Sequence, residues 1–240
     1  MSTQHNSKLS YLENATAILV HGAWADGSSW ARVVGPLQRE GLRVICAPIP
    51  LTSLRDDAAA LERVIDRTKG PIILVGHAYA GAVIAEVHNA RIKALVYIAA
   101  LAPDKGETVA DVFYRDEAHA DAPQLEPDAN GLIWMPEEAF GKAFAQRATT
   151  NDIEILAAVQ RPIAVACIQE VAGVPGWKAT PTWYLAAEHD HMINPKTQHF
   201  MAGRMNAHFS SADVDHTPSV TAPDVVVATI LDAAGVTLVE

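Results

Sequence analysis

The chain has 240 residues, of which 50% are hydrophobic and 19% are charged, a composition typical of one globular domain. Its 18 basic and 28 acidic residues give a net charge of −10, which argues against nucleic acid or an anionic membrane surface as a partner because both would repel it. No apolar run approaches the roughly 20 residues that span a bilayer.

Residues 1–14 are polar and lack the apolar core of a secretory signal. They are expected to form a tail, with an anchoring patch at residues 9–12. The two cysteines, Cys46 and Cys167, lie in apolar contexts and are expected to be buried thiols rather than a disulfide. Together these features predict a cytoplasmic protein.

The first part of the chain alternates short apolar runs with helical patterns. Apolar runs of strand length predict strands at residues 17–20, 42–47, 72–75 and 94–99. Capping serines and the 3.6-residue period predict helices at residues 30–40, 54–68 and 82–87. Strands that are apolar on both faces and alternate with helices indicate a parallel sheet covered on both sides.

The alternation breaks after Pro103, where turns and short helical stretches punctuated by proline follow until about residue 180. It resumes with strands at residues 181–187 and 207–214 and a helix at residues 223–234. The prediction is therefore a single α/β domain with about six mainly parallel strands. Its core covers about residues 16–103 and 181–240, and a helical cap is inserted at about residues 104–180.

The run from Pro71 to Gly81 reads as a buried strand, a sharp turn and a helix. That context suits a nucleophile elbow, whose pattern is G-x-S-x-G. Here the pattern is Gly76-His77-Ala78-Tyr79-Ala80, so alanine stands where the serine is expected. A methyl group cannot attack a carbonyl, so the sequence predicts the frame of a hydrolase site without its reacting atom. His77 is expected to pack or hydrogen-bond behind the elbow.

Other chemically active groups follow predicted strands, at the edge where ligands bind to parallel sheets. In chain order they are the loop His21-Gly22-Ala23, position 78, Asp190 and His216. This is the hydrolase order of oxyanion loop, nucleophile, acid and base. His216 is the candidate base and Asp190 its orienting acid, with Asp104 as the alternative acid. The backbone amides of Ala23 and Tyr79 are the candidate oxyanion donors.

These motifs, together with His21-Gly22-Ala23-Trp24 and Asp190-His191-Met192-Ile193, resemble the α/β-hydrolase superfamily over nearly the whole chain. The narrower resemblance is to small bacterial esterases, plant methyl esterases and hydroxynitrile lyases. It implies an α/β-hydrolase fold and a serine-type ester hydrolase that needs no cofactor. The sequence departs from the pattern at Ala80, which replaces the last glycine of the elbow, and at Ala78.

Alanine at position 78 has two explanations, an engineered Ser-to-Ala exchange that traps substrate, which is favoured, and a natural ligand-binding pseudo-hydrolase. A third interpretation is a lyase or cofactor-free oxygenase that uses His216 as its base. In the leading hypothesis, the chain is an esterase that is inactive or nearly so because Ala78 lacks a hydroxyl.

The expected partner is a small-molecule ester. Its pocket is predicted to be lined by Trp24, Tyr79, Phe113, Tyr114, Leu132, Trp134 and Met192. Trp30, Trp177 and Trp183 are assigned to packing. The run Glu188-His189-Asp190-His191 fits no common zinc spacing, so no metal is predicted. The oligomeric state stays open, with a homodimer as one alternative.

Overall fold

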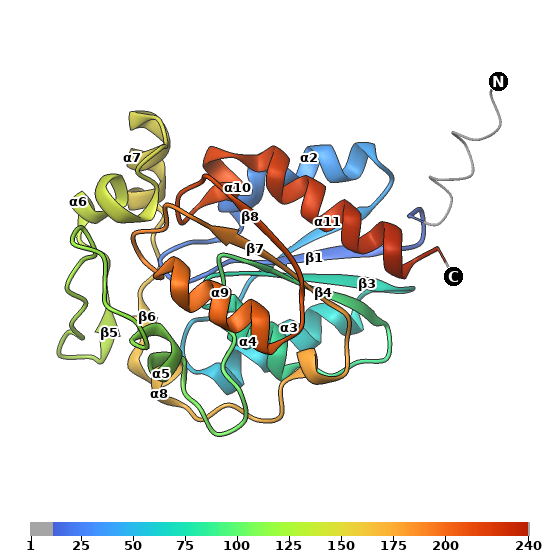
Figure 1. The fold of residues 1–240 in the computed structure, drawn as a ribbon, viewed down its shortest axis with the longest axis horizontal. Coiled ribbons are helices and arrows are strands. Elements are labelled where there is room, and N and C mark those ends of the chain that lie inside the picture. Colours follow the sequence, from blue (N-terminus) through green and yellow to red (C-terminus); the bar gives the residue numbers. More distant parts are fainter. Residues whose placement is uncertain (1–11, 240) are drawn as a thin grey trace.

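The fold is described for residues 12–239 of a computed structural model (Figure 1). Its centre is a six-stranded sheet in the order β2-β1-β3-β4-β7-β8, and every neighbouring pair is parallel. The prediction of an α/β-hydrolase fold with about six mainly parallel strands is confirmed. The strands are β1 (Thr16–Val20), β2 (Arg43–Ala47), β3 (Ile72–His77), β4 (Ile92–Ile98), β7 (Thr182–Ala187) and β8 (His208–Ala212).

The central strands are buried on both faces, which is why they read as unbroken apolar runs in the sequence. Along β1, Ile18 and Val20 contribute to one hydrophobic core whereas Leu19 contributes to the other. In β3, Leu74 contributes to the first core and Val75 to the second, because successive side chains of a strand point to opposite faces. This sheet therefore needs helices on both sides.

Helices cover the sheet in two layers, visible above and below it in Figure 1. Apolar residues of α2 and α11 belong to one core, and those of α3, α4 and α9 belong to the other. The bounds are η1 (Gly27–Trp30), α2 (Ala31–Arg39), α3 (Leu54–Asp66), α4 (Ala80–Glu86), α9 (Pro195–Arg204), α10 (Pro218–Thr221) and α11 (Pro223–Thr237). Helices α9 and α10 were not predicted from the sequence.

The middle of the segment between β4 and β7 lies beyond one end of the sheet, whereas its last part runs beneath the sheet near α4 (Figure 1). The segment was expected to contain only turns and short helices, which is wrong in one respect, because β5 and β6 form a small antiparallel sheet. These strands have two residues each, too few to show an alternating pattern. The elements are α5 (Val109–Phe113), β5 (Leu132–Ile133), α6 (Glu137–Ala139), η2 (Phe140–Phe144), α7 (Thr150–Ala158), β6 (Ile163–Ala164), α8 (Val165–Gln169) and η3 (Gly176–Lys178). The boundaries of the cap stay a prediction.

The predicted anchoring patch at residues 9–12 lies outside the described residues except for Leu12, whose side chain is buried. Among the helices of residues 12–239, none combines the length and apolarity that crossing a membrane requires. Both cysteines are free thiols, as expected, with Cys167 buried and Cys46 partly buried.

Candidate active site

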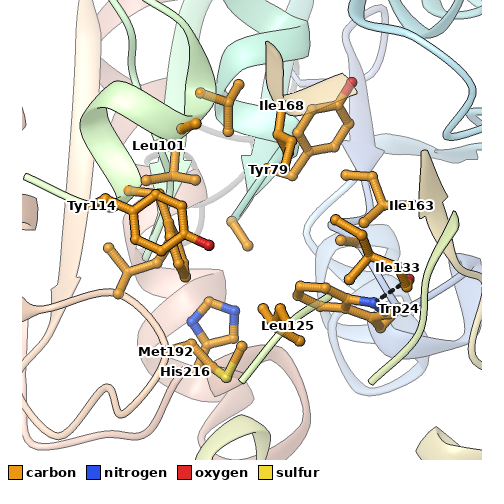
Figure 2. A pocket seen from close by; sticks show the side chains of 16 residues that line it. Trp24, Tyr79, Leu101, Tyr114, Leu125, Ile133, Ile163, Ile168, Met192 and His216 are labelled. Atoms are coloured by element: carbon orange, nitrogen blue, oxygen red, sulfur yellow. Dashed lines mark hydrogen bonds between the residues drawn. The ribbon is translucent and has the colours of Figure 1, made fainter. Parts of the chain in front are cut away.

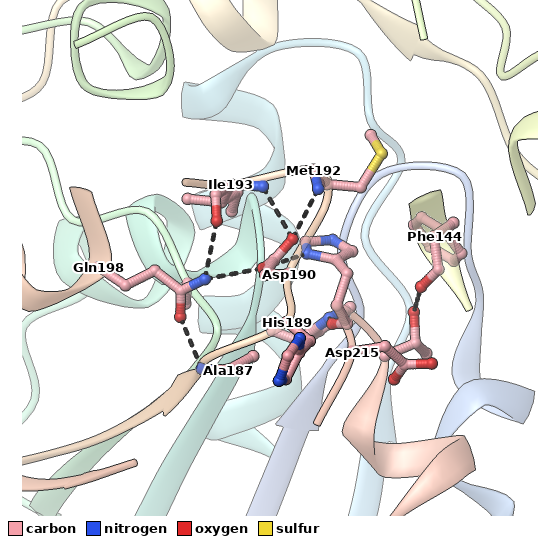
Figure 3. A network of polar contacts seen from close by, with 12 residues as sticks. Phe144, Ala187, His189, Asp190, Met192, Ile193, Gln198 and Asp215 are labelled. Carbon is pink, nitrogen blue, oxygen red and sulfur yellow. Dashed lines mark hydrogen bonds and ion pairs between the residues drawn. The ribbon is translucent and has the colours of Figure 1, made fainter. Parts of the chain in front are cut away.

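The structure brings Asp190 and His216 together although 26 positions separate them in the chain. Asp190 follows β7 and His216 follows β8, so both lie where neighbouring parallel strands end (Figure 3). Nδ1 of His216 lies 2.8 Å from Oδ2 of Asp190, and both side chains are buried. Because a carboxylate accepts hydrogen bonds, Nδ1 of His216 is the donor in this pair, and Nε2 is the nitrogen that can act as a base when the ring is neutral.

The Asp190 carboxylate is held by four donors. Its Oδ1 accepts the backbone N–H groups of Met192 at 2.7 Å and Ile193 at 2.8 Å. Its Oδ2 accepts hydrogen bonds from Nδ1 of His216 and from Nε2 of Gln198, each at 2.8 Å. Gln198 is itself fixed, because its Oε1 accepts the N–H of Ala187 at 3.0 Å. The carboxylate therefore has one defined orientation toward the imidazole.

Gln198 is a site residue that the sequence analysis missed, because helix α9 was not predicted. A signal was present, since Asn194 caps this helix through the N–H of Lys196 and Pro195 occupies its first turn. An asparagine followed by proline at the first helical position is a recognised helix start. A helix predicted from this signal would have put Gln198 in its first turns, shortly after Asp190 in the chain.

The turn around position 78 has the geometry of a strained elbow. Ala78 has a positive φ of 51°, a conformation that residues with a Cβ rarely adopt. Its carbonyl accepts the N–H groups of Gly81 at 3.1 Å and Leu101 at 2.9 Å, which stabilise the bend. A Cβ on Gly76 would lie 2.7 Å from the carbonyl oxygen of Ala80. The elbow therefore requires glycine at 76, whereas Ala80 is accommodated.

Gly81 offers a direct stability test of this tight packing. A Cβ at this position would lie 2.3 Å from the carbonyl oxygen of Leu101, a backbone atom that cannot move aside cheaply. Gly81→Ala is therefore expected to lower the free energy of unfolding by about 3 kcal/mol. Gly203→Ala is the control, because a Cβ there meets no atom within 4 Å and Gly203 lies in helix α9. It should stabilise the protein by up to about 1 kcal/mol in urea denaturation. Equal effects of the two exchanges would contradict this packing.

The first loop approaches position 78 closely. A Cβ on Gly22 would lie 3.0 Å from Cβ of Ala78, so only glycine fits well there. Within residues 12–239, the amides of Ala23 and Tyr79 donate no hydrogen bond, whereas the amides of Trp24 and Ala78 bond to Arg161 and Ile98. Ala23 and Tyr79 both line the same cavity as Ala78. Their predicted role as oxyanion donors fits this placement and stays a prediction.

His77 supports His216 from behind the elbow, as expected. Its Nε2–H donates to the carbonyl oxygen of His216 at 2.7 Å, and the two rings lie 4.9 Å apart. Burial lowers the pKa of His77 to about 3, so the ring is neutral in the folded protein. The residues on either side of His216 are fixed too, since Asp215 accepts the N–H of Arg147 at 2.9 Å and Thr217 donates to the carbonyl of Phe144 at 2.6 Å (Figure 3).

Position 78 and His216 face one cavity, the inner chamber (Figure 2). Of the pocket residues predicted from the sequence, five line it: Trp24, Tyr79, Phe113, Tyr114 and Met192. The others that line it were not predicted and are Leu101, Val109, Ala110, Leu125, Ile133, Ile163, Ile168 and Ile193.

The structure differs from the prediction at Leu132 and Trp134, which do not line the inner chamber. Ile133 lies between them and takes their place. Side chains alternate along the extended chain of β5, so when Ile133 faces inward its two neighbours face away. Trp134 is accordingly 49% exposed.

The chain also matches the model of the alpha/beta hydrolase family over residues 17–229. The chain belongs to the alpha/beta hydrolase family. This assignment agrees with the sheet topology and with the order of position 78, Asp190 and His216. No curated protein matches the sequence.

Solved structures share this fold at low sequence identity. Polyneuridine aldehyde esterase has a TM-score of 0.76 and 15% identity, with 91% of this chain and 98% of that chain covered. A pyrethroid hydrolase from Sphingobium faniae JZ-2 has a TM-score of 0.78 and 19% identity, with coverages of 92% and 97%. The methylesterase MES16 from Arabidopsis has a TM-score of 0.74 and 16% identity, with coverages of 92% and 99%. At these identities the likeness establishes the fold.

The walls of this α/β-hydrolase's inner chamber are almost wholly apolar. Two of its three amphipathic residues have their polar atoms bonded elsewhere, since Nε1 of Trp24 donates to the carbonyl of Ile133 at 2.9 Å (Figure 2). The hydroxyl of Tyr79 donates to Oδ2 of Asp57 at 2.7 Å. The imidazole of His216 and the hydroxyl of Tyr114 are thus the polar side-chain groups that remain for chemistry in this chamber.

Asp57 is a buried carboxylate that the sequence did not reveal. It lies on α3, and besides Tyr79 it accepts the N–H of Leu51 at 2.6 Å and contacts the thiol of Cys167 at 3.6 Å. Burial raises the pKa of Asp57 above its ordinary 3.8, and burial beside this carboxylate raises the pKa of Cys167 to about 12. The thiol is therefore unreactive. Asp57 anchors the ring that follows position 78.

The raised pKa of Asp57 predicts a pH dependence of stability. Between the ordinary carboxyl pKa and the raised one, the folded chain keeps a proton that the unfolded chain has released. The contribution of Asp57 to the free energy of unfolding therefore falls as the pH rises through this window. Asp57→Asn removes the titration, so the stability of the variant relative to the parent should increase across the window. Urea denaturation from about pH 4 to 8 measures this difference, and a constant difference would contradict the assignment.

Asp104, the alternative acid, does not contact His216, and the side chains of residues 188–191 do not form a metal site. Asp104 pairs with Lys178 at 2.5 Å. The side chains of the run 188–191 diverge, since Glu188 pairs with His199 and His189 with Asp213, whereas Asp190 holds His216. They do not converge on one point as metal ligands do.

One group of possible ligands lies elsewhere in the described chain. His119, Asp121 and His191 place ligand atoms within 4.8 Å of one another. The two imidazoles are stacked, with centroids 3.6 Å apart and an angle of 10° between their planes. Lone pairs of parallel stacked rings do not converge on one ion, so this arrangement does not form a ready metal site.

Proposed function

We propose that the site is that of a carboxylic-ester hydrolase in which alanine occupies the nucleophile position. The observation that carries this proposal is the oriented pair of His216 and Asp190 facing the same chamber as Ala78. Two of the structurally similar proteins are named as esterases, which supports an ester rather than another substrate.

With serine at position 78, its hydroxyl would attack the ester carbonyl while Nε2 of His216 takes the proton. The amides of Ala23 and Tyr79 would stabilise the negative oxygen of the tetrahedral intermediate. His216 would then return the proton to the leaving alcohol, forming an acyl-enzyme. In the second half, His216 would deprotonate a water molecule that attacks this acyl group, releasing the acid and restoring serine.

With alanine at position 78 the first bond cannot form. We expect this protein to bind an ester without forming an acyl-enzyme. The intact machinery around Ala78 supports the interpretation that an active form of the protein carries serine there and that the alanine is an engineered exchange. Sequencing codon 78 of the natural gene distinguishes this from a natural ligand-binding pseudo-hydrolase.

A stopped-flow experiment tests the proposal. Ala78→Ser mixed with an excess of p-nitrophenyl butanoate should release a rapid burst of about one p-nitrophenol per chain before the steady state, because acylation precedes slower deacylation. The unmodified protein should show no burst. A folded Ala78→Ser protein that releases no p-nitrophenol above background would refute ester hydrolysis at this site.

A second candidate function uses the present residues alone. Because the His216 and Asp190 pair is complete, the imidazole can act as a base on a substrate hydroxyl, as in a lyase or a cofactor-free oxygenase. Turnover of such a substrate by the Ala78 protein, abolished by His216→Ala, would favour this function over the ester hydrolase.

A further inference from the structure

A second cavity adjoins the inner chamber. This second cavity is the outer chamber. Four residues line both cavities, namely Phe113, Tyr114, Leu125 and Met192. Shared walls on four side chains place the two chambers next to each other.

The outer chamber presents mainly apolar groups. Ala118, Ala122 and Pro123 complete its wall, together with two polar residues whose side chains are already bonded. Oδ2 of Asp116 accepts the hydroxyl of Thr197 at 2.7 Å and pairs with the guanidinium of Arg115, which balances the charge of this carboxylate. The side-chain amide of Asn194 donates to the carbonyl of Glu117 at 2.8 Å, and its oxygen accepts the N–H of Lys196 at 2.9 Å. The chamber thus suits an uncharged apolar group.

Part of the shared wall lies on the histidine side of the site. Figure 2 shows Met192 beside His216 and Leu125 between His216 and Trp24, whereas Ile133 and Ile163 lie across the chamber. Met192 is held there because its N–H is bonded to the carboxylate that orients His216. The imidazole must hand its proton to the leaving alcohol, so the alcohol part of an ester has to lie on the histidine side.

We infer that the outer chamber is the subsite for the alcohol part of the substrate and that the substrate class is esters of bulky, uncharged, apolar alcohols. The acyl part then occupies the far side of the inner chamber, beside Ile133 and Ile163. This inference rests on the proposed ester hydrolysis for its assignment of the two halves. A methyl ester would leave the outer chamber unfilled, so its alcohol part would bury little apolar surface there.

The test is equilibrium binding to the protein as it stands, whose Ala78 leaves the ester uncleaved. The ligands are the methyl and benzyl esters of phenylacetic acid, and the readout is tryptophan fluorescence, because Trp24 lines the inner chamber. Burying the extra phenyl ring should make the benzyl ester bind roughly tenfold to a hundredfold more tightly. A ratio of the two affinities near one would overturn the inference.

Two matched variants localise the effect. Ala122→Leu fills the outer chamber and should lower the affinity ratio at least fivefold, whereas Ala110→Leu fills the inner chamber and should weaken both esters while changing the ratio less than twofold. Ala118→Leu serves the same purpose if Ala122→Leu does not fold. An affinity ratio unaffected by filling the outer chamber would overturn the inference.

The outcome is separable from that of the proposed function. If the ratios behave as expected but Ala78→Ser hydrolyses neither ester, the outer chamber is supported as a binding site and ester hydrolysis fails. If Ala78→Ser hydrolyses both esters but the ratio is near one, hydrolysis stands and the alcohol subsite is wrong.

Discussion

Ala78→Ser is expected to raise the turnover of activated esters by about a millionfold, the factor that loss of a serine nucleophile typically costs. The reason is that the histidine proposed to activate a serine is already oriented. The imidazole of His216 is oriented by a carboxylate with four donors, and position 78 already has the φ of 51° that an elbow requires. The added hydroxyl therefore needs no rearrangement of its surroundings. Steady-state kinetics with p-nitrophenyl butanoate measure the gain.

Ala82→Ser is the matched control for this exchange. It adds the same hydroxyl to the buried face of α4, one turn beyond the elbow. Ala82 does not line the inner chamber, so its hydroxyl should produce no hydrolysis. Equal activity of the two variants would show that the gain does not come from position 78.

Asp190→Asn in the Ala78→Ser background is expected to lower kcat by about ten thousandfold. The carboxylate fixes the proton on Nδ1 of His216 and balances the charge that forms on the ring during the reaction. An asparagine can present its NH₂ group to the ring instead, which favours the wrong tautomer and leaves no lone pair toward position 78. The measurement is kcat for the paired variants at neutral pH.

Asp104→Asn distinguishes this role from a general loss of negative charge. Asp104 follows the fourth strand and was the alternative acid in the sequence, but its carboxylate pairs with Lys178. In the same Ala78→Ser background its exchange should change kcat less than twofold. If Asp104→Asn were the more damaging exchange, the assignment of the acid would be wrong.

The strands and the order of the site residues were readable because their signals are local. An apolar run such as residues 72–75 identifies a buried strand, and polar groups directly after such runs identify the edge of a parallel sheet. These two rules suffice to bring Ala78, Asp190 and His216 to one place. The comparison of motifs with a known superfamily then added the order of their roles.

The contacts that the sequence did not reveal depend on packing between distant segments. Asp57 reads as one charge on an amphipathic helix, and only the fold shows that it is buried against Tyr79, 22 positions away. Leu132 and Trp134 were predicted to line the pocket and Ile133 was not, but the direction of a two-residue strand is set by its partner β6. Side-chain direction in the cap therefore required the structure.

The most direct measurement is covalent labelling of position 78 with a serine-directed fluorophosphonate, followed by peptide mass spectrometry. We predict that folded Ala78→Ser takes up one phosphonyl group on the peptide that contains position 78, and that adding His216→Ala abolishes this labelling. The unmodified protein should take up none. A folded Ala78→Ser protein that stays unlabelled, or one that is labelled on another peptide, would show that position 78 does not face a working histidine.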